Sequence, residues 1–377
     1  MRINIGSFGG RAHMLDLARE LEKMGHNVKF YSYVPTSFAM KFGLKKHNNS
    51  NFWILTLPFI LLFKIYGKSH KLLYYYRCIY DIILGLYMRK CDIFIGQVPM
   101  HVFSLKMAKK RFNAITISDT GISHIKIYSS ILSKIGAYKE NYLDYQRYIN
   151  GYKYADYISV ASEFVQKGFI QEGVNSSKLL FNPYGVDISN FHPTELDKKD
   201  TYDLIIVGQW SKRKGSDMVI SVAQELNLSV LHVGSIVDVE FPKNNLFTHI
   251  EPQFEKKLIE YYQKCKLFVF PSQEDGFGLV LIQAVACGLP IVCSPNTGGP
   301  TLKHLLNDTE GICIMKDITT DALKNAILQI TPFVNSQVGI RNYASHLLDK
   351  VSWSEYGKRY NNNLIRIITV SYTHLRA

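Results

Sequence analysis

Short runs of β-forming apolar residues alternate along the chain with segments whose apolar residues recur at helical spacing. The chain opens with a strand at 2–5, a glycine turn, a helix that ends at Gly25-His26, and a second strand at 28–30. The apolar positions of this helix follow the helical period: Met14, Leu15, Leu17, Ala18, Leu21 and Met24. The pattern predicts a βαβ unit, and a second such unit opens with the strand at 203–208, so we expect an α/β protein.

The most informative stretch, residues 266–299, reads as a strand at 267–270, a polar loop, a helix at 279–287 and a strand at 291–293. The helix is apolar except for Gln283, which predicts burial on nearly all sides. Asp275 and Gln283 are eight residues apart, a little over two helical turns, so both could face one ligand. A buried amide without a partner costs about 1–3 kcal/mol. Gln283 therefore bonds either a neighbouring backbone group, which this residue alone favours, or a ligand hydroxyl.

A basic loop follows the strand at 203–208. Lys212, Arg213 and Lys214 lie directly before a predicted helix, for which Ser216-Asp217 is a plausible cap. Cationic side chains beside free amides at a helix N-terminus are suited to binding a diphosphate. The alternative is that the three basic residues are simply exposed to solvent, which is the commoner case for three adjacent basic residues.

The first half of the chain offers weaker candidates. Gly6, Gly9 and Gly10 allow close backbone approach to an anion at a helix N-terminus, and His13 just beyond them is interpreted as structural. Asp119 and His124 follow a predicted strand, at the sheet edge where α/β proteins bind ligands. A structural role for His124 is at least as well supported as a catalytic one.

Residues 51–90 are strongly apolar and rich in tyrosine. The apolar run is interrupted by Pro58 and Lys64 and falls short of the roughly 20 apolar residues that a spanning helix needs. Two interpretations stay open: helices buried in the first domain, or an interfacial surface whose aromatic and basic residues rest on an anionic membrane.

Composition narrows the class of protein. A length of 377 residues predicts two domains, and 47% hydrophobic residues suffice for two cores. The six cysteines show no CxxC pair, and the chain begins directly with a strand rather than a signal peptide, so we expect a cytoplasmic protein with reduced thiols. A formal charge of +13 predicts anionic partners, among which nucleic acid is the least expected because the basic residues are dispersed.

The stretch 266–299 resembles the signature of family 4 glycosyltransferases, which are retaining enzymes of the two-domain GT-B fold. Their pattern is a Glu, seven residues and a second Glu, in a context like PSxxEGFGLxxxEAMACGxPVV. Asp275 and Gln283 stand at the two acid positions, and GFG and ACGLP match. FNPYGVDISNFHP resembles the family's PNGVD turn with Tyr184 in place of Asn. Lys214-Gly215 match its phosphate-binding GR…KG, with Gln209 at the Arg position.

The resemblance implies two Rossmann-like domains facing each other across a cleft. The first is an acceptor domain at 1–178 and the second is a donor domain at 179–345. A helix at 346–369 then crosses back to the first domain. Residues 370–377, VSYTHLRA, resemble a translated sequencing adapter, so the natural C-terminus is expected to differ after about Thr369. The implied catalytic residues are Asp275, His124 and Lys214. The implied donor-binding residues are Gly10, Gln209, Arg213, Lys214, Gly276, Phe277, Gly278, Leu279 and Gln283.

The implied reaction moves a sugar, with retention, from a nucleotide diphosphate sugar to a cell-envelope glycan or a lipid-linked acceptor. No DxD triplet occurs, so we expect no metal and no other cofactor. The expected location is the cytoplasm, with the inner membrane face as a candidate surface. Two alternatives remain. One is a nucleotide-sugar epimerase or phosphorylase of the same fold. The other is a non-catalytic nucleotide-sugar-binding or membrane-binding protein, which the replacement of both signature Glu residues and of the phosphate Arg supports.

Overall fold

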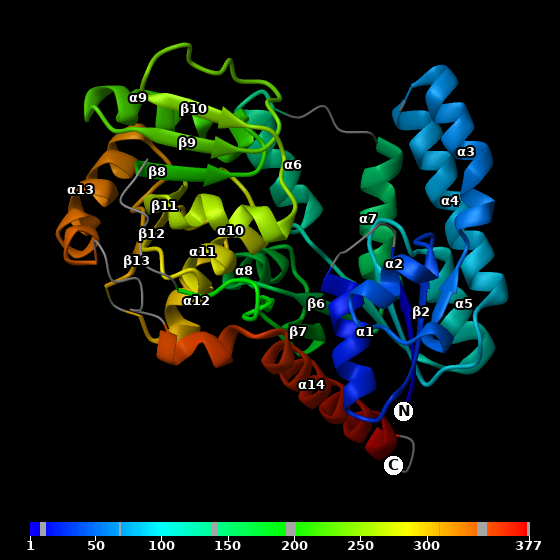
Figure 1. The fold of residues 1–377 in the computed structure, drawn as a ribbon. Coiled ribbons are helices and arrows are strands. Elements are labelled where there is room, and N and C mark those ends of the chain that lie inside the picture. The colour runs from blue at the N-terminus through cyan, green and yellow to red at the C-terminus, as the bar shows by residue number, and fades with distance from the viewer. Residues whose placement is uncertain are drawn as a thin grey trace.

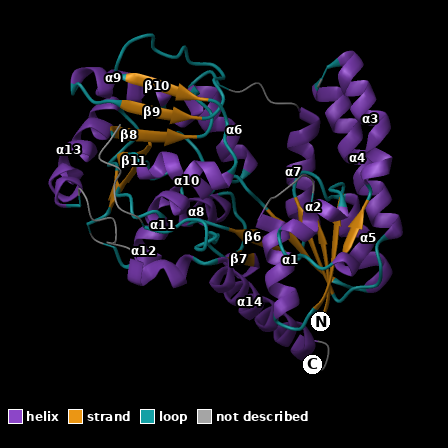
Figure 2. Ribbon diagram, viewed as in Figure 1, coloured by secondary structure: helices purple, strands orange, loops and turns teal. Residues whose placement is uncertain are grey.

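The computed structural model contains two parallel sheets, each flanked by helices (Figures 1 and 2). It describes residues 1–7, 13–67, 69–137, 142–193, 201–308, 310–337 and 345–374. Within these residues the first sheet has the strand order β3-β2-β1-β4-β5-β6-β7, and the second has the order β10-β9-β8-β11-β12-β13. The predicted α/β class is confirmed.

The first sheet is formed by β1 (Arg2–Gly6), β2 (Asn27–Ser32), β3 (Asn49–Asn51), β4 (Ile93–Gln97), β5 (Ile115–Asp119), β6 (Tyr157–Val160) and β7 (Leu179–Phe181). Its helices are α1 (His13–Lys23), α2 (Thr36–Lys41), α3 (Trp53–Tyr66), α4 (His70–Tyr87), α5 (Phe103–Phe112), α6 (Ile125–Lys134), α7 (Tyr142–Tyr154) and α8 (Glu163–Gln171). The predicted domain boundary after residue 178 is too early, because Leu179 to Phe181 pair with β6 and complete the first sheet.

The second sheet is formed by β8 (Tyr202–Val207), β9 (Val230–Val233), β10 (Phe247–Ile250), β11 (Cys265–Phe270), β12 (Ile291–Cys293) and β13 (Ile312–Ile314). Its helices are α9 (Ser216–Glu225), α10 (Glu255–Gln263), α11 (Leu279–Ala286), α12 (Gly299–Leu306) and α13 (Thr320–Ser336), and Lys212–Lys214 form the short 3-10 helix η3. The predicted cap of α9 is wrong: the N-cap is Gly215, and the Ser216 hydroxyl instead accepts a hydrogen bond from Ser211 N at 2.9 Å.

A long C-terminal helix ties the second domain to the first. Helix α14 (Trp353–His374) runs beside α1 (Figure 1). His26 bonds Asn361 at 2.7 Å, and a Cβ added to Gly357 would overlap Glu20, so the two helices approach closely at this glycine. The helix contributes buried Tyr356 and other apolar residues to a core that also contains residues of both sheets.

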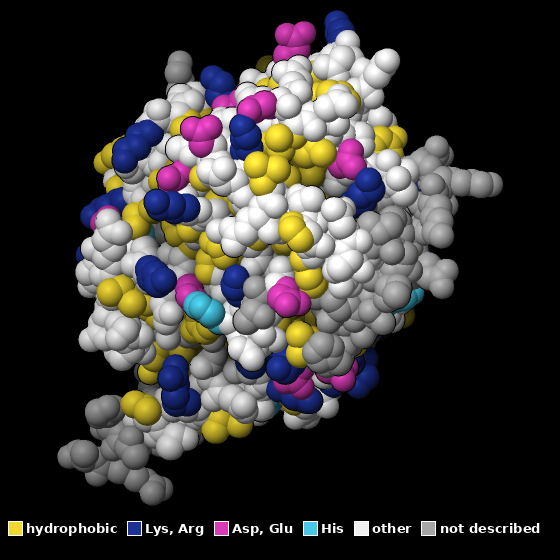
Figure 3. Space-filling model, turned by 90° about the vertical axis from the view of Figure 1, so that its left-hand side faces the viewer, with side chains coloured by type: hydrophobic (Ala, Val, Ile, Leu, Met, Phe, Trp, Pro, Cys, Tyr) yellow, Lys and Arg dark blue, Asp and Glu magenta, His cyan; other side chains and the backbone are white. Residues whose placement is uncertain are grey.

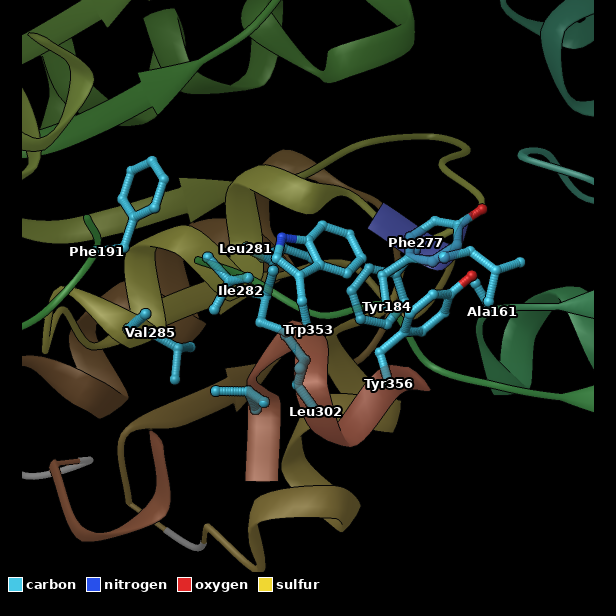
Figure 4. Close-up of a cluster of buried hydrophobic side chains, with 14 of the residues drawn as sticks. Ala161, Tyr184, Phe191, Phe277, Leu281, Ile282, Val285, Leu302, Trp353 and Tyr356 are labelled. Atoms are coloured by element: carbon cyan, nitrogen blue, oxygen red, sulfur yellow. The ribbon is translucent and has the colours of Figure 1, made fainter. Parts of the chain in front are cut away.

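That shared core is visible at the junction of the domains (Figure 4). Tyr184 of the interdomain segment packs edge-on against Phe277 at 5.3 Å and against Tyr356 at 6.1 Å between ring centroids. Ala161 from the first domain and Trp353 from α14 lie in the same cluster. Tyr184, which replaces the family's usual Asn, is therefore a packing residue that joins three parts of the fold.

Residues 51–90 form α3 and α4, which pack on each other through Phe59 and Phe63 against Tyr76, at centroid distances of 4.8 and 5.9 Å. The interpretation of this region as buried helices is wrong for α3, because much of its apolar surface is exposed. Among the described residues, no helix has the combination of length and apolar character needed to cross a membrane.

Leu364→Ala tests the contribution of α14 to stability. Leu364 is fully buried, so truncation is expected to lower the free energy of unfolding by about 2–5 kcal/mol. Its neighbour Ile365 is 51% exposed, and Ile365→Ala should cost less than about 1 kcal/mol. Urea denaturation followed by circular dichroism measures both; equal midpoints for the two variants would contradict this role of the helix.

Candidate active site

Loops at the carboxyl ends of strands from both sheets meet between the domains. The Glu274 carboxylate, in the loop after β11, accepts hydrogen bonds through Oε1 from Ser123 N at 3.0 Å and Ser123 Oγ at 2.9 Å. Ser162, after β6, donates to Gly276 O at 2.6 Å. A Cβ at Gly276 would collide with Gly121 O, so only glycine fits at this contact. Such sheet edges are where α/β proteins bind ligands.

An ionic cluster lies beside this contact, formed by Arg213, Lys214, Glu274 and Asp275. Lys214 is buried; its ammonium pairs with Asp275 Oδ2 and lies 4.5 Å from the centre of the Phe270 ring. Arg213 Nη1 is 3.9 Å from Asp275 Oδ2 and 3.8 Å from Glu274 Oε2. The two candidate regions of the second domain, the basic loop and the loop after β11, are therefore in direct contact.

Backbone geometry positions Lys214. Gly215 has φ +72° and connects the short helix η3 to α9. A side chain at Gly215 would collide with Pro271 O, so the basic loop and the loop after β11 are in close contact at this point. Glycine is required there both for the left-handed conformation and for the close approach.

Burial and charge act in opposite directions within the cluster. Desolvation works to raise the pKa of the Asp275 carboxyl, but Lys214 and Arg213 outweigh it and hold that pKa below its usual value. Burial lowers the pKa of the Lys214 ammonium, and the nearby Arg213 charge adds to this while Asp275 opposes it. Because Asp275 faces two cations, we take it as ionised and the pair as a salt bridge.

Glu274 was not among the residues predicted from the sequence. It is fully buried, and its Oε2 atom has no hydrogen-bond partner among the described residues. Burial, together with the charge of Asp275, raises the pKa of Glu274 to about 7, against the opposing effects of Ser123 and Arg213. The signal available in the sequence was two successive acids in one loop, of which the family pattern accounts for only Asp275.

The GFG segment connects this cluster to α11. Asp275 Oδ1 accepts a hydrogen bond from Phe277 N at 3.2 Å, and Gly278, with φ +79°, is the N-cap of α11. The Phe277 side chain is buried in the shared core. Gly276 and Gly278 therefore shape the loop, and Phe277 anchors it.

Gln283 and Leu279 are both on α11 and lie outside the ionic cluster. Both line a cavity of about 30 Å³ together with His13 and Glu255. Gln283 Oε1 accepts a hydrogen bond from the Tyr262 hydroxyl at 3.3 Å, so its protein partner is a side chain and not the neighbouring backbone group that the sequence favoured. The position of Gln283 at a cavity keeps the ligand-hydroxyl interpretation open.

The remaining candidates lie outside the ionic cluster. His124 caps α6: its Nδ1 accepts from Lys126 N at 3.4 Å, and its ring packs on Tyr152 and Phe169. These are the contacts of a structural residue, and a catalytic role for His124 stays a prediction. Gln209 is exposed. Gly10 lies outside the described residues.

His13 and Asp119 form a buried hydrogen bond of 2.7 Å, and the His13 ring lies 4.3 Å from the Tyr184 ring centroid. These contacts agree with the structural interpretation of His13, although the same residue also lines the cavity shared with Gln283. Among the described residues, no group of three or more His, Cys, Asp or Glu side chains is placed to hold a metal ion. The expectation that the reaction needs no metal stays a prediction.

Two domains, each built on a sheet of parallel strands, are the architecture of GT-B proteins, and solved structures agree. Sucrose-phosphate synthase from Thermosynechococcus elongatus superimposes with a TM-score of 0.68 at 15% identity, over 98% of this chain and 99% of that one. HepE from Anabaena, in complex with UDP and glucose, gives a TM-score of 0.62 at 15% identity, over 97% and 100%. The chain has the GT-B fold.

Sequence comparison shows which families the chain is similar to. Residues 187–344 match the family described as glycosyl transferases group 1. An uncharacterized glycosyltransferase of Methanocaldococcus jannaschii is 22% identical over 93% of this chain and 87% of its own length. D-inositol 3-phosphate glycosyltransferase of Paenarthrobacter aurescens is 24% identical over 34% of this chain and 37% of that protein. Residues 187–344 are thus similar to the glycosyl transferases group 1 family, and the chain is similar to a glycosyltransferase over most of its length, so the resemblance to glycosyltransferases is confirmed at that level.

Glu274→Gln should alter the pH dependence of stability. Between the ordinary pKa of 4.5 and the folded-state value of about 7, folded Glu274 holds a proton that the unfolded chain has released. Stability of the wild type therefore falls as pH rises through this window, and the glutamine variant lacks that loss. We expect the difference in the free energy of unfolding, variant minus wild type, to increase by about 1–3 kcal/mol from about pH 5 to about pH 8.

Urea denaturation at the two pH values measures this difference. Glutamine keeps an oxygen that accepts the Ser123 hydrogen bonds, so the variant isolates the ionisation of Glu274. Glu260→Gln, at an exposed position of α10, is the matched control. If both variants show the same pH dependence of stability as wild type, the expectation that buried Glu274 titrates with a raised pKa is wrong.

Proposed function

We propose that the protein transfers a sugar from a nucleotide diphosphate sugar, bound between its two domains, to an acceptor held by the first domain. The observation that carries this proposal is the pair of cations, Arg213 and Lys214, at the carboxyl edge of the second sheet beside the loop that contacts the first domain. The match of residues 187–344 to the glycosyl transferases group 1 family and the UDP-glucose complex of the structural neighbour HepE support it. By resemblance to family 4, the transfer proceeds with retention.

Lys214 and Arg213 would bind the diphosphate. Breaking the bond between sugar and phosphate develops negative charge on the departing group, and fixed cations in a buried site stabilise that charge. An ammonium group has three donors, so Lys214 can bond a phosphate oxygen while it keeps Asp275. Asp275 would thereby set the position of the lysine as well as contact the sugar. No metal ion is required in this scheme.

Gln283 would bind a ribose hydroxyl from its position on α11, where it lines the same cavity as Leu279. Its amide already accepts from Tyr262 and lines a cavity, so it is held in place and retains donors for a ligand. The short side chain of Asp275 and the neutral amide of Gln283 take the places of two longer or charged glutamates in the family pattern. We propose that this pair still supports turnover, with a cell-envelope glycan or a lipid-linked sugar as acceptor.

The donor is identified by release of nucleoside diphosphate from a panel of UDP-, GDP-, ADP- and dTDP-sugars, with and without membrane lipid extract. We expect release from one donor, stimulated by the lipid extract, and NMR of the product should show the donor's anomeric configuration. Thermal stabilisation by a nucleotide without release from any donor would point instead to a binding protein. Release without any acceptor would favour an epimerase-type or hydrolytic enzyme.

Lys214→Ala tests the phosphate assignment. We expect donor turnover to fall by about 10²–10³-fold, because a fixed cation is lost where charge develops. Lys212→Ala is the matched control, since Lys212 is the adjacent exposed lysine of the same short helix. Lys214→Ala/Asp275→Asn removes both charges of the pair, so a comparison of its stability with that of Lys214→Ala shows whether an unpaired Asp275 destabilises the single variant. Unchanged turnover in folded Lys214→Ala protein would exclude the assignment.

A further inference from the structure

Helices α3 and α4 form a hairpin at the outer edge of the first domain, and its upper part extends beyond the first sheet (Figures 1 and 2). The hairpin is fixed through α4. The buried Asp81 carboxylate accepts hydrogen bonds from Val102 N, Phe103 N and Ser104 N at 2.9, 2.7 and 2.9 Å, and from Arg147 at 2.8 Å. Asp81 therefore caps α5 and holds α4 against the domain, and α3 contacts α4 through Phe59 and Phe63.

The outer surface of this hairpin is apolar. On α3, Ile54, Leu61 and Ile65 are 66%, 60% and 63% exposed, and residues spaced by three or four positions share one face of a helix. Further exposed apolar side chains of the hairpin are Leu55, Leu57, Tyr66, Tyr75, Ile79, Ile82, Leu86 and Tyr87. Soluble monomers rarely expose a contiguous apolar patch of this kind without a binding role.

The segment that contains the hairpin is also strongly basic. From Asn27 to Lys90 the sequence has ten lysine and arginine residues and one acidic residue, Asp81. Asp81 is buried and paired with Arg147, so it presents no charge to a partner. The exposed cations on and beside the hairpin include Lys64, Lys71, Arg89 and Lys90. By contrast, basic and acidic side chains are interspersed on the outer face of the second domain (Figure 3).

Charge and helix length together indicate what kind of partner covers the apolar surface of the hairpin. A symmetric contact with a second copy would bring the same basic edges together, which like-charge repulsion opposes. Helix α3 has 14 residues and is about 21 Å long, too short for a hydrocarbon core of about 30 Å. Apolar residues flanked by Tyr and Lys, in a segment whose single acid is buried, suit the boundary between headgroups and acyl chains of an anionic bilayer.

We propose that the α3–α4 hairpin docks this protein on an anionic membrane surface. Ile54, Leu61 and Ile65 enter the acyl boundary, and the flanking lysines contact the headgroups. This proposal deepens the proposed function, since docking would bring the acceptor domain to a lipid-linked substrate. The docking itself needs neither donor nor turnover.

Flotation with vesicles of phosphatidylcholine, with and without phosphatidylglycerol, tests the proposal in the absence of nucleotide. We expect wild type to float with the anionic vesicles and Leu61→Glu/Ile65→Glu to bind them about tenfold or more weakly, because two charges enter the apolar face. Leu328→Glu is the matched control, since Leu328 is a 49% exposed leucine on α13 of the other domain. It should float like wild type.

A second variant, Lys64→Gln/Lys71→Gln, should lose part of the preference for anionic over neutral vesicles, and added salt should weaken binding of the wild type. Absence of wild-type binding to anionic vesicles, or equal binding by Leu61→Glu/Ile65→Glu, would overturn the proposal. So would a dimer in sedimentation velocity that this variant dissociates, because a second copy would then cover the patch. Donor turnover measured without vesicles reports separately on the proposed reaction.

Discussion

The contact between the loop after β11 and the first domain is the constraint on which the candidate site depends. Gly276 touches Gly121 so closely that no side chain fits, and Glu274 is buried with one oxygen bonded to Ser123 across the domain boundary. This contact fixes the direction of Asp275, and Asp275 in turn holds Lys214. A disturbance of the domain interface is therefore transmitted directly to the cations that would bind a diphosphate.

Apolar packing at the junction of the domains accompanies this polar contact. Tyr184, Phe277 and Tyr356 come from the interdomain segment, the second domain and α14, and they form one cluster. Large aromatic side chains bury much apolar surface, so this cluster, with α14 against α1, stabilises the relative position of the domains. The hairpin of α3 and α4 is attached elsewhere, through Asp81 and Arg147, so its surface is free to serve a different purpose.

Much of the fold and part of the site were predictable from local pattern. Strands such as β8, β11 and β12 and the buried helix α11 appear where hydrophobic runs and glycine or proline stops placed them. Lys214 and Asp275 were identified as candidates, but they are 61 residues apart and their direct pairing had no local signal. Glu274 was missed because its burial depends on a serine 151 residues away. His124 has the contacts of a helix cap, which the strand-end position alone did not reveal.

Neighbouring residues alone were sufficient to predict the alternation of strands and helices, the glycines at sharp turns and the resemblance to a glycosyltransferase signature. The basic charge of the segment from Asn27 to Lys90 and the apolar character of α3 are likewise properties of the sequence. Which apolar residues are covered and which charges meet depends instead on the assembled fold. Burial, desolvation and ion pairing act between residues far apart in the chain, so the burial of Glu274 and the exposure of Leu61 are settled only when the elements pack together.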